Sequence, residues 1–337
     1  MTTTTATATG LEEKLQEDHV YTITTTSNTT NNNSSNKVKV LEYNSYLAHQ
    51  RYYDDLKHVD ITYIDYGYFP HNNSSGEKGK EEGGGRVVIE QRKRLGKGGF
   101  CWDAAFILGE HVISLEEEWN NRSVNSNSNK KRTPANVLEL GAGTGLCGIM
   151  IGTATNSHVT ITDLPELQDL MAENVRRNFG HDDVKEKEGN VDDANDVAAV
   201  ELSDEERKLI THLDDGTKSQ GTVKSRVLRW GNEEDYFLQE DDQQQQHGGQ
   251  QAYDVIIGAD IVASLYDPIA LAQTLHALCG PTTKIYISSK SRLDKPHEEF
   301  DTEMTRLFTK VVKKGCPCSR LKTPDVFIIE AEGKRDI

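Results

Sequence analysis

A glycine-rich segment constrains the fold of this chain more than any other feature of its sequence. A short apolar run at residues 137–140 is followed at once by Gly141, Gly143 and Gly145, and residues 146–151 then have helical character. Glycines let a backbone turn sharply without a Cβ in the way, and a helix that starts directly after them points its amide groups at whatever binds there. The segment therefore predicts a strand, a tight ligand-binding turn and a helix in immediate succession.

Strands and helices alternate along the rest of the chain. Further strands are predicted at residues 159–162, 223–228, 253–258, 284–288 and 326–331. Helices are predicted from Pro165 to a stop at Gly180, from Asp267-Pro268 to Cys279, and over residues 296–310. Repeated strand–helix units imply an α/β, Rossmann-like fold, in which helices cover both faces of a mostly parallel sheet. The ligand should bind at the carboxyl ends of the central strands.

The spacing within the glycine turn indicates which ligand binds. A nicotinamide-binding turn reads G-x-G-x-x-G, whereas here the third glycine, Gly145, comes one residue early. Glu139 would repel a pyrophosphate but suits a cationic amino group, so the pattern favours S-adenosylmethionine over NAD. Asp163, at the end of the second strand, can accept hydrogen bonds from both ribose hydroxyls. The alternatives are a purely structural glycine turn and a helix-capping Asp163.

Polar segments divide the chain into a folded part and inserts. Only 35% of the residues are hydrophobic and the mean hydropathy is -0.66, because several stretches contain almost no large apolar side chains. Such stretches bury too little apolar area to offset the entropy of ordering. We predict a disordered Thr/Asn-rich tail at 1–36, a partly ordered N-terminal extension at 37–85, and a folded domain at 86–333 with inserts at about 120–133, 181–221 and 232–251.

Charge and cysteine usage exclude several kinds of partner. Most of the net charge of -16 lies in the second and third inserts, and the chain lacks the clustered Lys and Arg that grip nucleic acid. Cys101 and Cys147 suit buried thiols, and Cys316 and Cys318 have no partner at ligand spacing, so no metal site is expected. No apolar run is long enough to cross a membrane, and no signal core is present. We expect a cytoplasmic monomer without membrane contact, with the nucleus left open.

Several segments together resemble a known family. They are VLELGAGTGLCG at 137–148, VTITDLP at 159–165, NVRRN at 174–178, LRWG at 228–231, IGADIV at 257–262 and, upstream, WDAA at 102–105. In these motifs the chain resembles the methyltransferase-like protein-lysine methyltransferases, also called family 16. The resemblance implies the seven-stranded class I methyltransferase fold and S-adenosylmethionine as cofactor. It also implies a protein substrate, such as an elongation factor or a chaperone.

The resemblance implies a set of cofactor-binding residues as well. They are Trp102, Glu139, Gly141, Ala142, Gly143, Asp163, Trp230 and Ala259. Trp230 ends the third strand, where an indole can cover an adenine. Trp102 is equally consistent with packing on a helix.

The family's substrate motif is only partly present. It reads D-x-x-Y after the fourth strand; here Asp260 keeps the acid, Ala263 replaces the Tyr, and Tyr266 follows three residues later. We expect Asp260 to position the ammonium of a substrate lysine, with a helix-capping role as its alternative. The sequence thus predicts a protein-lysine methyltransferase. A small-molecule methyltransferase and a non-catalytic S-adenosylmethionine-binding module remain alternatives, and Ala263 is the residue that keeps them open.

Overall fold

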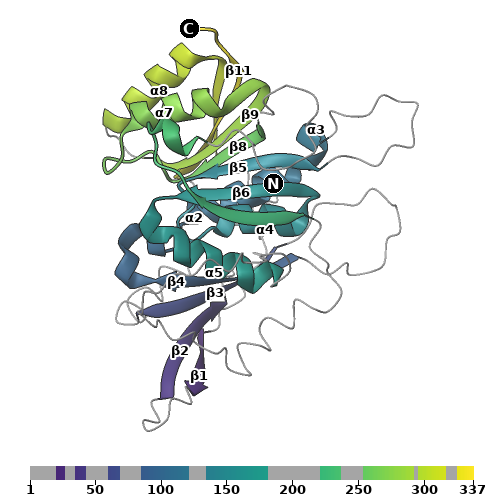
Figure 1. The fold of residues 1–337 in the computed structure, drawn as a ribbon, viewed down its shortest axis with the longest axis vertical. Coiled ribbons are helices and arrows are strands. Elements are labelled where there is room, and N and C mark those ends of the chain that lie inside the picture. Colours follow the sequence, from purple (N-terminus) through teal and green to yellow (C-terminus); the bar gives the residue numbers. More distant parts are fainter. Residues whose placement is uncertain are drawn as a thin grey trace, which may run out of the picture.

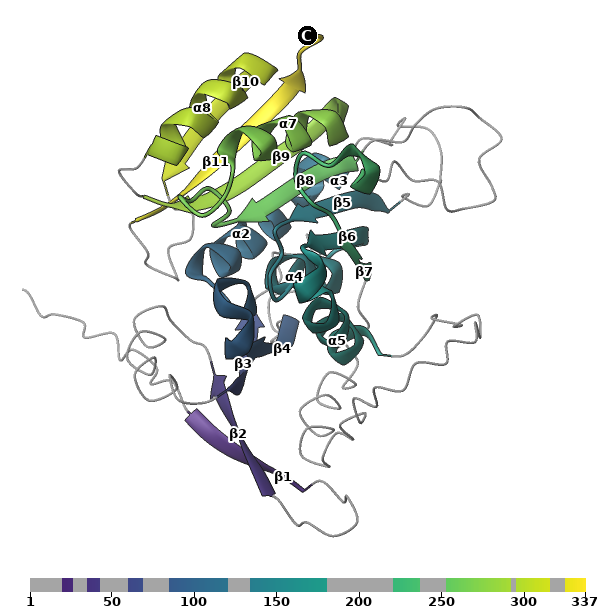
Figure 2. The same cartoon turned by 60° about the vertical axis from the view of Figure 1, so that its left-hand side comes forward.

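The computed structural model describes residues 20–26, 35–42, 60–68, 85–120, 134–180, 221–236, 253–291, 295–315 and 325–337. These residues form two sheets, seen in Figures 1 and 2. The four-stranded sheet has the order β1 (Val20–Thr26), β2 (Ser35–Glu42), β3 (Ile61–Tyr68) and β4 (Gly85–Arg92). The seven-stranded sheet has the order β10 (Phe308–Gly315), β11 (Val326–Lys334), β9 (Cys279–Lys290), β8 (Tyr253–Ala259), β5 (Ala135–Leu140), β6 (Ser157–Asp163) and β7 (Thr222–Val227).

The seven-stranded sheet is parallel except for one strand. β5 pairs in parallel with β6 on one side and with β8 on the other, and β7 and β9 extend the parallel run outward. β11 is antiparallel to both of its neighbours, β9 and β10. The chain order reverses at β5, and the crevice at the carboxyl end of such a strand is where α/β sheets bind ligands.

Helices cover both faces of this sheet, because parallel strands are joined by helices that cross over the sheet (Figures 1 and 2). Val137 of β5 packs in a core with α2 (Asp103–Ser114) and α4 (Leu146–Ala154). The next residue, Leu138, packs on the opposite face with α7 (Pro268–Leu278) and α8 (Lys295–Leu307). Since both faces of β5 are covered, all six of its residues are buried.

The small sheet adjoins the first of these faces. Its strand β4 packs against α4 and α5 (Gln168–Phe179), and its buried residues Ile64, Tyr66, Val87 and Ile89 belong to the same core as α2 and α4. Figure 2 shows β3 and β4 beside α4 and α5, away from the antiparallel strand β11. The shorter elements are η1 (Lys93–Gly99), α3 (Glu116–Asn120), η2 (Pro165–Leu167) and η4 (Glu233–Asp235).

The N-terminal region differs from the sequence prediction. Residues 1–36 were predicted to be a disordered tail, but the structure places β1 within them and pairs it with β2, from Val20 opposite Leu41 to Thr26 opposite Ser35. The physical reason is that the Thr and Asn content lowered the hydropathy, while the β-branched residues of VYTITTT favour a strand.

The elements of the domain agree with the prediction except near its C-terminal end. The helix predicted over 296–310 ends at Leu307, and β10 begins at Phe308. The apolar spacing of Phe300, Met304 and Leu307 continues by one position to Phe308, which is buried as the first residue of a strand. β10 depends on pairing with β11, a distant segment, and helical periodicity does not report such pairing.

The third predicted insert is shorter than expected. Residues 232–236, at the start of the range 232–251, are part of the described fold. Asp235 accepts hydrogen bonds from the backbone and side chain of Arg229, and the hydroxyl of Tyr236 lies 2.9 Å from Oγ1 of Thr274 on α7. The other predicted inserts fall outside the described residues, apart from Asn120 and Gly221 at their ends, as do Cys316 and Cys318. Within the described residues, no helix has the length and apolar character needed to cross a membrane.

Candidate functional site

The glycine turn joins β5 to α4 in a conformation that only glycine adopts readily. Gly141, Gly143 and Gly145 have positive φ angles of 63°, 57° and 81°. A Cβ on Gly141 would lie 2.7 Å from Cγ2 of Ile261, and one on Gly143 would lie 2.8 Å from the carbonyl oxygen of Gly98. The turn is therefore closely packed by neighbouring segments, and a side chain at either position would displace them.

Asp163 connects the end of β6 to this turn. Its Oδ2 accepts a hydrogen bond of 2.7 Å from the amide of Gly143, and its Oδ1 accepts one of 2.8 Å from Leu164. Burial raises the pKa of the Asp163 carboxyl above its usual value, and the two backbone hydrogen bonds oppose that rise. A carboxylate oxygen has two lone-pair sites, so each oxygen keeps one for a ligand hydroxyl.

Glu139 lies deeper than the sequence suggested. It is buried, and its Oε2 accepts a 2.8 Å hydrogen bond from the amide of Gly148 in the first turn of α4. Burial raises the pKa of Glu139 to about 8. The structure thus places this carboxyl beneath the start of α4, as an acceptor for the helix. Its contact with a ligand's amino group stays a prediction.

The two tryptophans predicted to bind the cofactor, Trp102 and Trp230, lie on separate segments at the carboxyl edge of the sheet. Trp102, directly before α2, is 42% exposed, and its Nε1 donates a 2.9 Å hydrogen bond to the carbonyl of Lys97. Trp230, three residues after β7, lies against the glycine turn, because a Cβ on Gly141 would be 3.1 Å from its Cζ2. Its ring meets that of Tyr266 edge-on, with centroids 5.6 Å apart.

Asp260 has an unusual backbone conformation. With φ at 54°, it is the one non-glycine residue of the described segments in the left-handed region. Its amide donates a 2.8 Å hydrogen bond to the carbonyl of Ser288, and its Oδ1 accepts a longer one from the amide of Lys290. Such a conformation costs on the order of 1–2 kcal/mol, and strain of this kind gathers at functional sites. Ala259, before it, ends β8 half-buried.

The structure thus brings most of the predicted site residues to one edge of the sheet. Gly141, Ala142 and Gly143 follow β5, Asp163 ends β6, Trp230 follows β7, Ala259 ends β8 and Asp260 follows it. Glu139 lies below this edge. Tyr266 contacts Trp230, a neighbour that the sequence did not assign to it. Among the described residues, no group of three or more His, Cys, Asp or Glu side chains is placed to hold a metal ion.

Sequence reasoning missed the residues that contact the glycine turn from α5 and from the segment before α2. Asn174 on α5 is fully buried and donates a 2.9 Å hydrogen bond to the carbonyl of Thr144, between Gly143 and Gly145. The Thr144 hydroxyl lies 3.3 Å from the sulfur of Cys101. A signal was present, since a polar Asn on the apolar face of an amphipathic helix requires a partner.

The fold and the site together define a class of protein. A seven-stranded sheet that is parallel but for one strand, with a glycine turn after β5 and an acid at the end of β6, is the architecture of the seven-stranded methyltransferases. A family model described as lysine methyltransferase matches residues 83–193 and 191–307. The chain belongs to this lysine methyltransferase family, and S-adenosylmethionine is the cofactor of its class.

Individual relatives are similar over the same region. The chain is 28% identical over 208 residues to "EEF1A lysine methyltransferase 3" of Xenopus tropicalis, which covers 61% of this chain and 64% of that protein. It is 28% identical over 225 residues to "Protein N-lysine methyltransferase METTL21A" of Danio rerio, covering 66% of this chain and 75% of the relative. The chain thus spans less than two thirds of the length of the first of these relatives.

Solved structures of methyltransferases are also similar. The crystal structure of human methyltransferase-like protein 13 in complex with SAH matches with a TM-score of 0.35 and 11% identity, over 70% of this chain and 84% of that one. The CurJ carbon methyltransferase matches with a TM-score of 0.39 and 14% identity, over 69% of this chain and 54% of that one.

Proposed function

We propose that this chain is an S-adenosylmethionine-dependent protein-lysine N-methyltransferase. The observation that carries the proposal is the meeting of three features at one sheet edge. They are a glycine turn with no room for a side chain, the Asp163 carboxylate bonded to that turn, and the strained Asp260 one strand away. Membership of the lysine methyltransferase family supports lysine as the acceptor.

The residues of the turn fit the cofactor. The glycine turn leads directly into α4, and a helix that starts directly after such a turn points its amide groups at the ligand. The free lone pairs of Asp163 can accept hydrogen bonds from ribose hydroxyls, and the indole of Trp230, beside Gly141, can cover the adenine. When bound, S-adenosylmethionine supplies a methyl group already activated on a sulfonium.

Asp260 is the residue proposed to act on the substrate. A lysine side chain has an ordinary pKa near 10.4, so only about one in a thousand is neutral at pH 7.4, a difference of roughly 4 kcal/mol. A carboxylate at the site attracts the ammonium and orients it before it loses its proton. The backbone bonds from Asp260 to Ser288 and Lys290 fix the carboxylate at the ends of β8 and β9.

The substrate class, the oligomeric state and the compartment are further proposals. One relative is named for EEF1A, which supports an elongation factor as the substrate class, with a chaperone as the second candidate. We further propose that the protein acts as a monomer in the cytoplasm, with the nucleus left open, and without membrane or nucleic-acid contact. The net charge of -16 and the lack of clustered Lys and Arg support the last point, because gripping a nucleic-acid backbone requires such clusters.

Methyl-labelled cofactor tests the proposed function directly. The protein is incubated with it and with a fractionated cell lysate, and the labelled residue is identified by mass spectrometry. The expected result is label on a lysine of one or a few proteins. Label confined to the small-molecule fraction would establish the small-molecule alternative, and no label in any fraction would leave a non-catalytic binding module.

A variant at position 263 distinguishes a lysine acceptor from a different acceptor. Ala263 is half-buried three residues after Asp260, where the family has Tyr. Ala263→Tyr should keep or raise activity on a lysine substrate if the residue at this position only adjusts how that substrate binds. Loss of all activity would mean that the space at Ala263 is filled by a different acceptor, and the lysine assignment would fail.

A further inference from the structure

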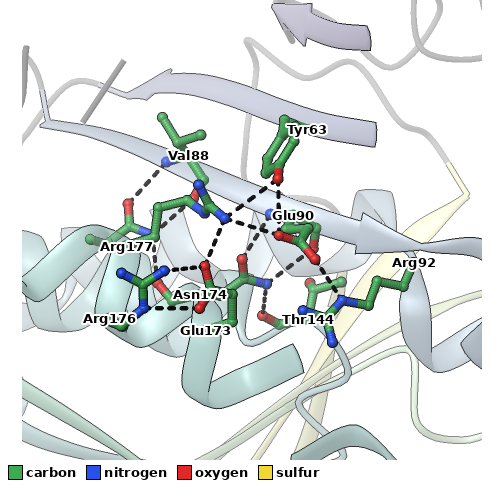
Figure 3. A network of polar contacts seen from close by, with 10 residues as sticks. Tyr63, Val88, Glu90, Arg92, Thr144, Glu173, Asn174, Arg176 and Arg177 are labelled. Atoms are coloured by element: carbon green, nitrogen blue, oxygen red, sulfur yellow. Dashed lines mark hydrogen bonds and ion pairs between the residues drawn. The ribbon is translucent and has the colours of Figure 1, made fainter. Parts of the chain in front are cut away.

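Asn174 uses its whole side-chain amide to bind backbone groups of two different segments. Its Oδ1 accepts a 2.8 Å hydrogen bond from the amide of Glu90 on β4, and its Nδ2 donates a 3.0 Å hydrogen bond back to the carbonyl of Glu90. The same Nδ2 donates a 2.9 Å hydrogen bond to the carbonyl of Thr144 in the glycine turn. Figure 3 shows Asn174 between Glu90 and Thr144.

The helix that carries Asn174 is fixed in place by an ion cluster. Arg177, also buried, donates hydrogen bonds of 2.9 Å to Glu90 and 2.8 Å to Glu173, and its guanidinium lies 4.7 Å from the ring centre of Tyr63 (Figure 3). This cluster joins α5 to β3 and β4 directly behind the turn. The amide of Asn174 therefore has a rigid support from which to hold Thr144.

Asn178, one helical turn further on, repeats half of this arrangement. Its Oδ1 accepts a 2.9 Å hydrogen bond from the amide of Val88, and its Nδ2 donates one of 2.9 Å to the carbonyl of Val88. Its remaining hydrogen bond, of 2.8 Å, goes to the carbonyl of Asn174 and not to the turn. Asn174 and Asn178 thus join α5 to β4 in the same way, and of these two Asn174 alone also binds the glycine turn.

We propose that Asn174 is a positioning residue that holds the glycine turn in its cofactor-binding conformation. This inference rests on the proposed function. With the Thr144 carbonyl bound from behind, the turn is preorganised before a ligand arrives, which favours affinity. Without that bond, the carbonyl is left without its partner and the turn spends part of its time in other conformations. The apparent dissociation constant then rises in inverse proportion to the competent fraction.

The matched pair Asn174→Ala and Asn178→Ala tests the proposal. Binding of S-adenosylhomocysteine is measured by calorimetry and stability by urea unfolding, on the full chain. Both variants should lose stability, because each gives up a two-bond bridge between α5 and β4. Only Asn174→Ala should weaken binding, by about tenfold or more. In turnover assays the same variant should raise KM for the cofactor more than it lowers kcat.

A second variant covers the case in which the alanine variant does not fold. Asn174→Asp keeps the volume and the acceptor for the Glu90 amide but cannot donate to Thr144 when ionised, so it should also weaken binding. Equal dissociation constants for the Asn174 and Asn178 variants would overturn the proposal. So would a folded Asn178→Ala beside two unfolded Asn174 variants, because Asn174 would then serve folding alone. If the parent protein does not bind the ligand, the proposed function itself fails.

Discussion

At the scale of single residues, the site contains two acids that differ in how deeply the fold buries them. Glu139 is buried under α4, and Asp260 sits half-buried in a strained backbone conformation at the edge of the sheet. The sequence identified both as acids of one site but did not separate them. Glu139 lies within β5, whose two faces are both covered, whereas Asp260 follows the end of β8, and a motif does not record what covers each position.

Burial of Glu139 makes stability depend on pH. Its pKa is about 8 in the folded protein, above the ordinary value of 4.5, so the folded state holds a proton that the unfolded state has released. The free energy of unfolding should therefore fall as the pH rises from about 5 to about 8, by up to about 1.4 kcal/mol per pH unit from this group. Glu139→Gln keeps an acceptor for Gly148 and should lose this part of the pH dependence.

Urea unfolding of the parent and of Glu139→Gln at intervals between pH 5 and pH 9 measures the difference. The variant should be the more stable of the two above pH 8. Parallel profiles would mean that Glu139 is already ionised in the folded protein.

For Asp260, we predict loss of activity without loss of stability. Asn tolerates the left-handed region as Asp does, so Asp260→Asn keeps the backbone and shape but removes the charge that orients an ammonium. Hydrogen bonds to charged groups contribute about 1.5–3 kcal/mol, so methyl transfer should fall about 10- to 100-fold. Cofactor affinity should change by no more than about threefold. Initial rates and calorimetry check both, and a variant with the parent's rate would remove Asp260 from the mechanism.

At the scale of elements, the small sheet and α5 are held together by buried charge. Arg177 pairs with Glu90 at 2.9 Å, and both side chains are almost fully buried. Arg177→Met keeps an unbranched apolar stem, although a shorter one, and leaves the Glu90 carboxylate with one cationic partner fewer. Removing one partner of a buried pair is strongly destabilising, and we expect a loss of about 3 kcal/mol in urea unfolding.

Arg176→Met is the matched control on the same helix. Arg176 pairs with Glu173 and is about one third exposed, and exposed pairs contribute at most about 1 kcal/mol. Equal losses in the two variants would show that the buried cluster does not hold α5.

Most elements of the large sheet were predictable because their signals are local. The apolar residues of β8 and the Asp267-Pro268 start of α7 each lie within a few positions, and Asp267 does cap its helix, accepting from the amides of Ile269 and Ala270. β10 and the strands β1 to β3 of the small sheet were not predicted, since each forms by pairing with a segment whose position the sequence does not reveal. The same holds at the site: the glycine turn is a local pattern, while the bond from Asn174 to Thr144 spans thirty residues.

At the scale of the whole molecule, the polar inserts should be dispensable. The deletion in the third insert starts at residue 238, because Asp235 and Tyr236 are bonded to Arg229 and Thr274. Removing 183–219 and 238–250, each replaced by a short Gly/Ser linker, should leave cooperative unfolding and S-adenosylhomocysteine binding intact. Surface loop length affects stability only weakly.

A longer deletion provides the comparison. One that begins at Glu234 removes Asp235 and Tyr236 and should weaken binding, since both side chains secure the segment that carries Trp230. If the shorter deletion abolishes cooperative unfolding, the removed segments pack on the core.

The position of the antiparallel strand β11 has a consequence for biosynthesis. β11 follows β9 and β10 in the chain but lies between them in the sheet. While the protein is being made, β9 and β10 leave the ribosome before the strand that joins them, and each exposes unpaired backbone groups. The buried side chains of Ile328 and Ile329 arrive only with β11. A ribosome that stalls before residue 326 would therefore release a client for chaperones and not a smaller folded protein.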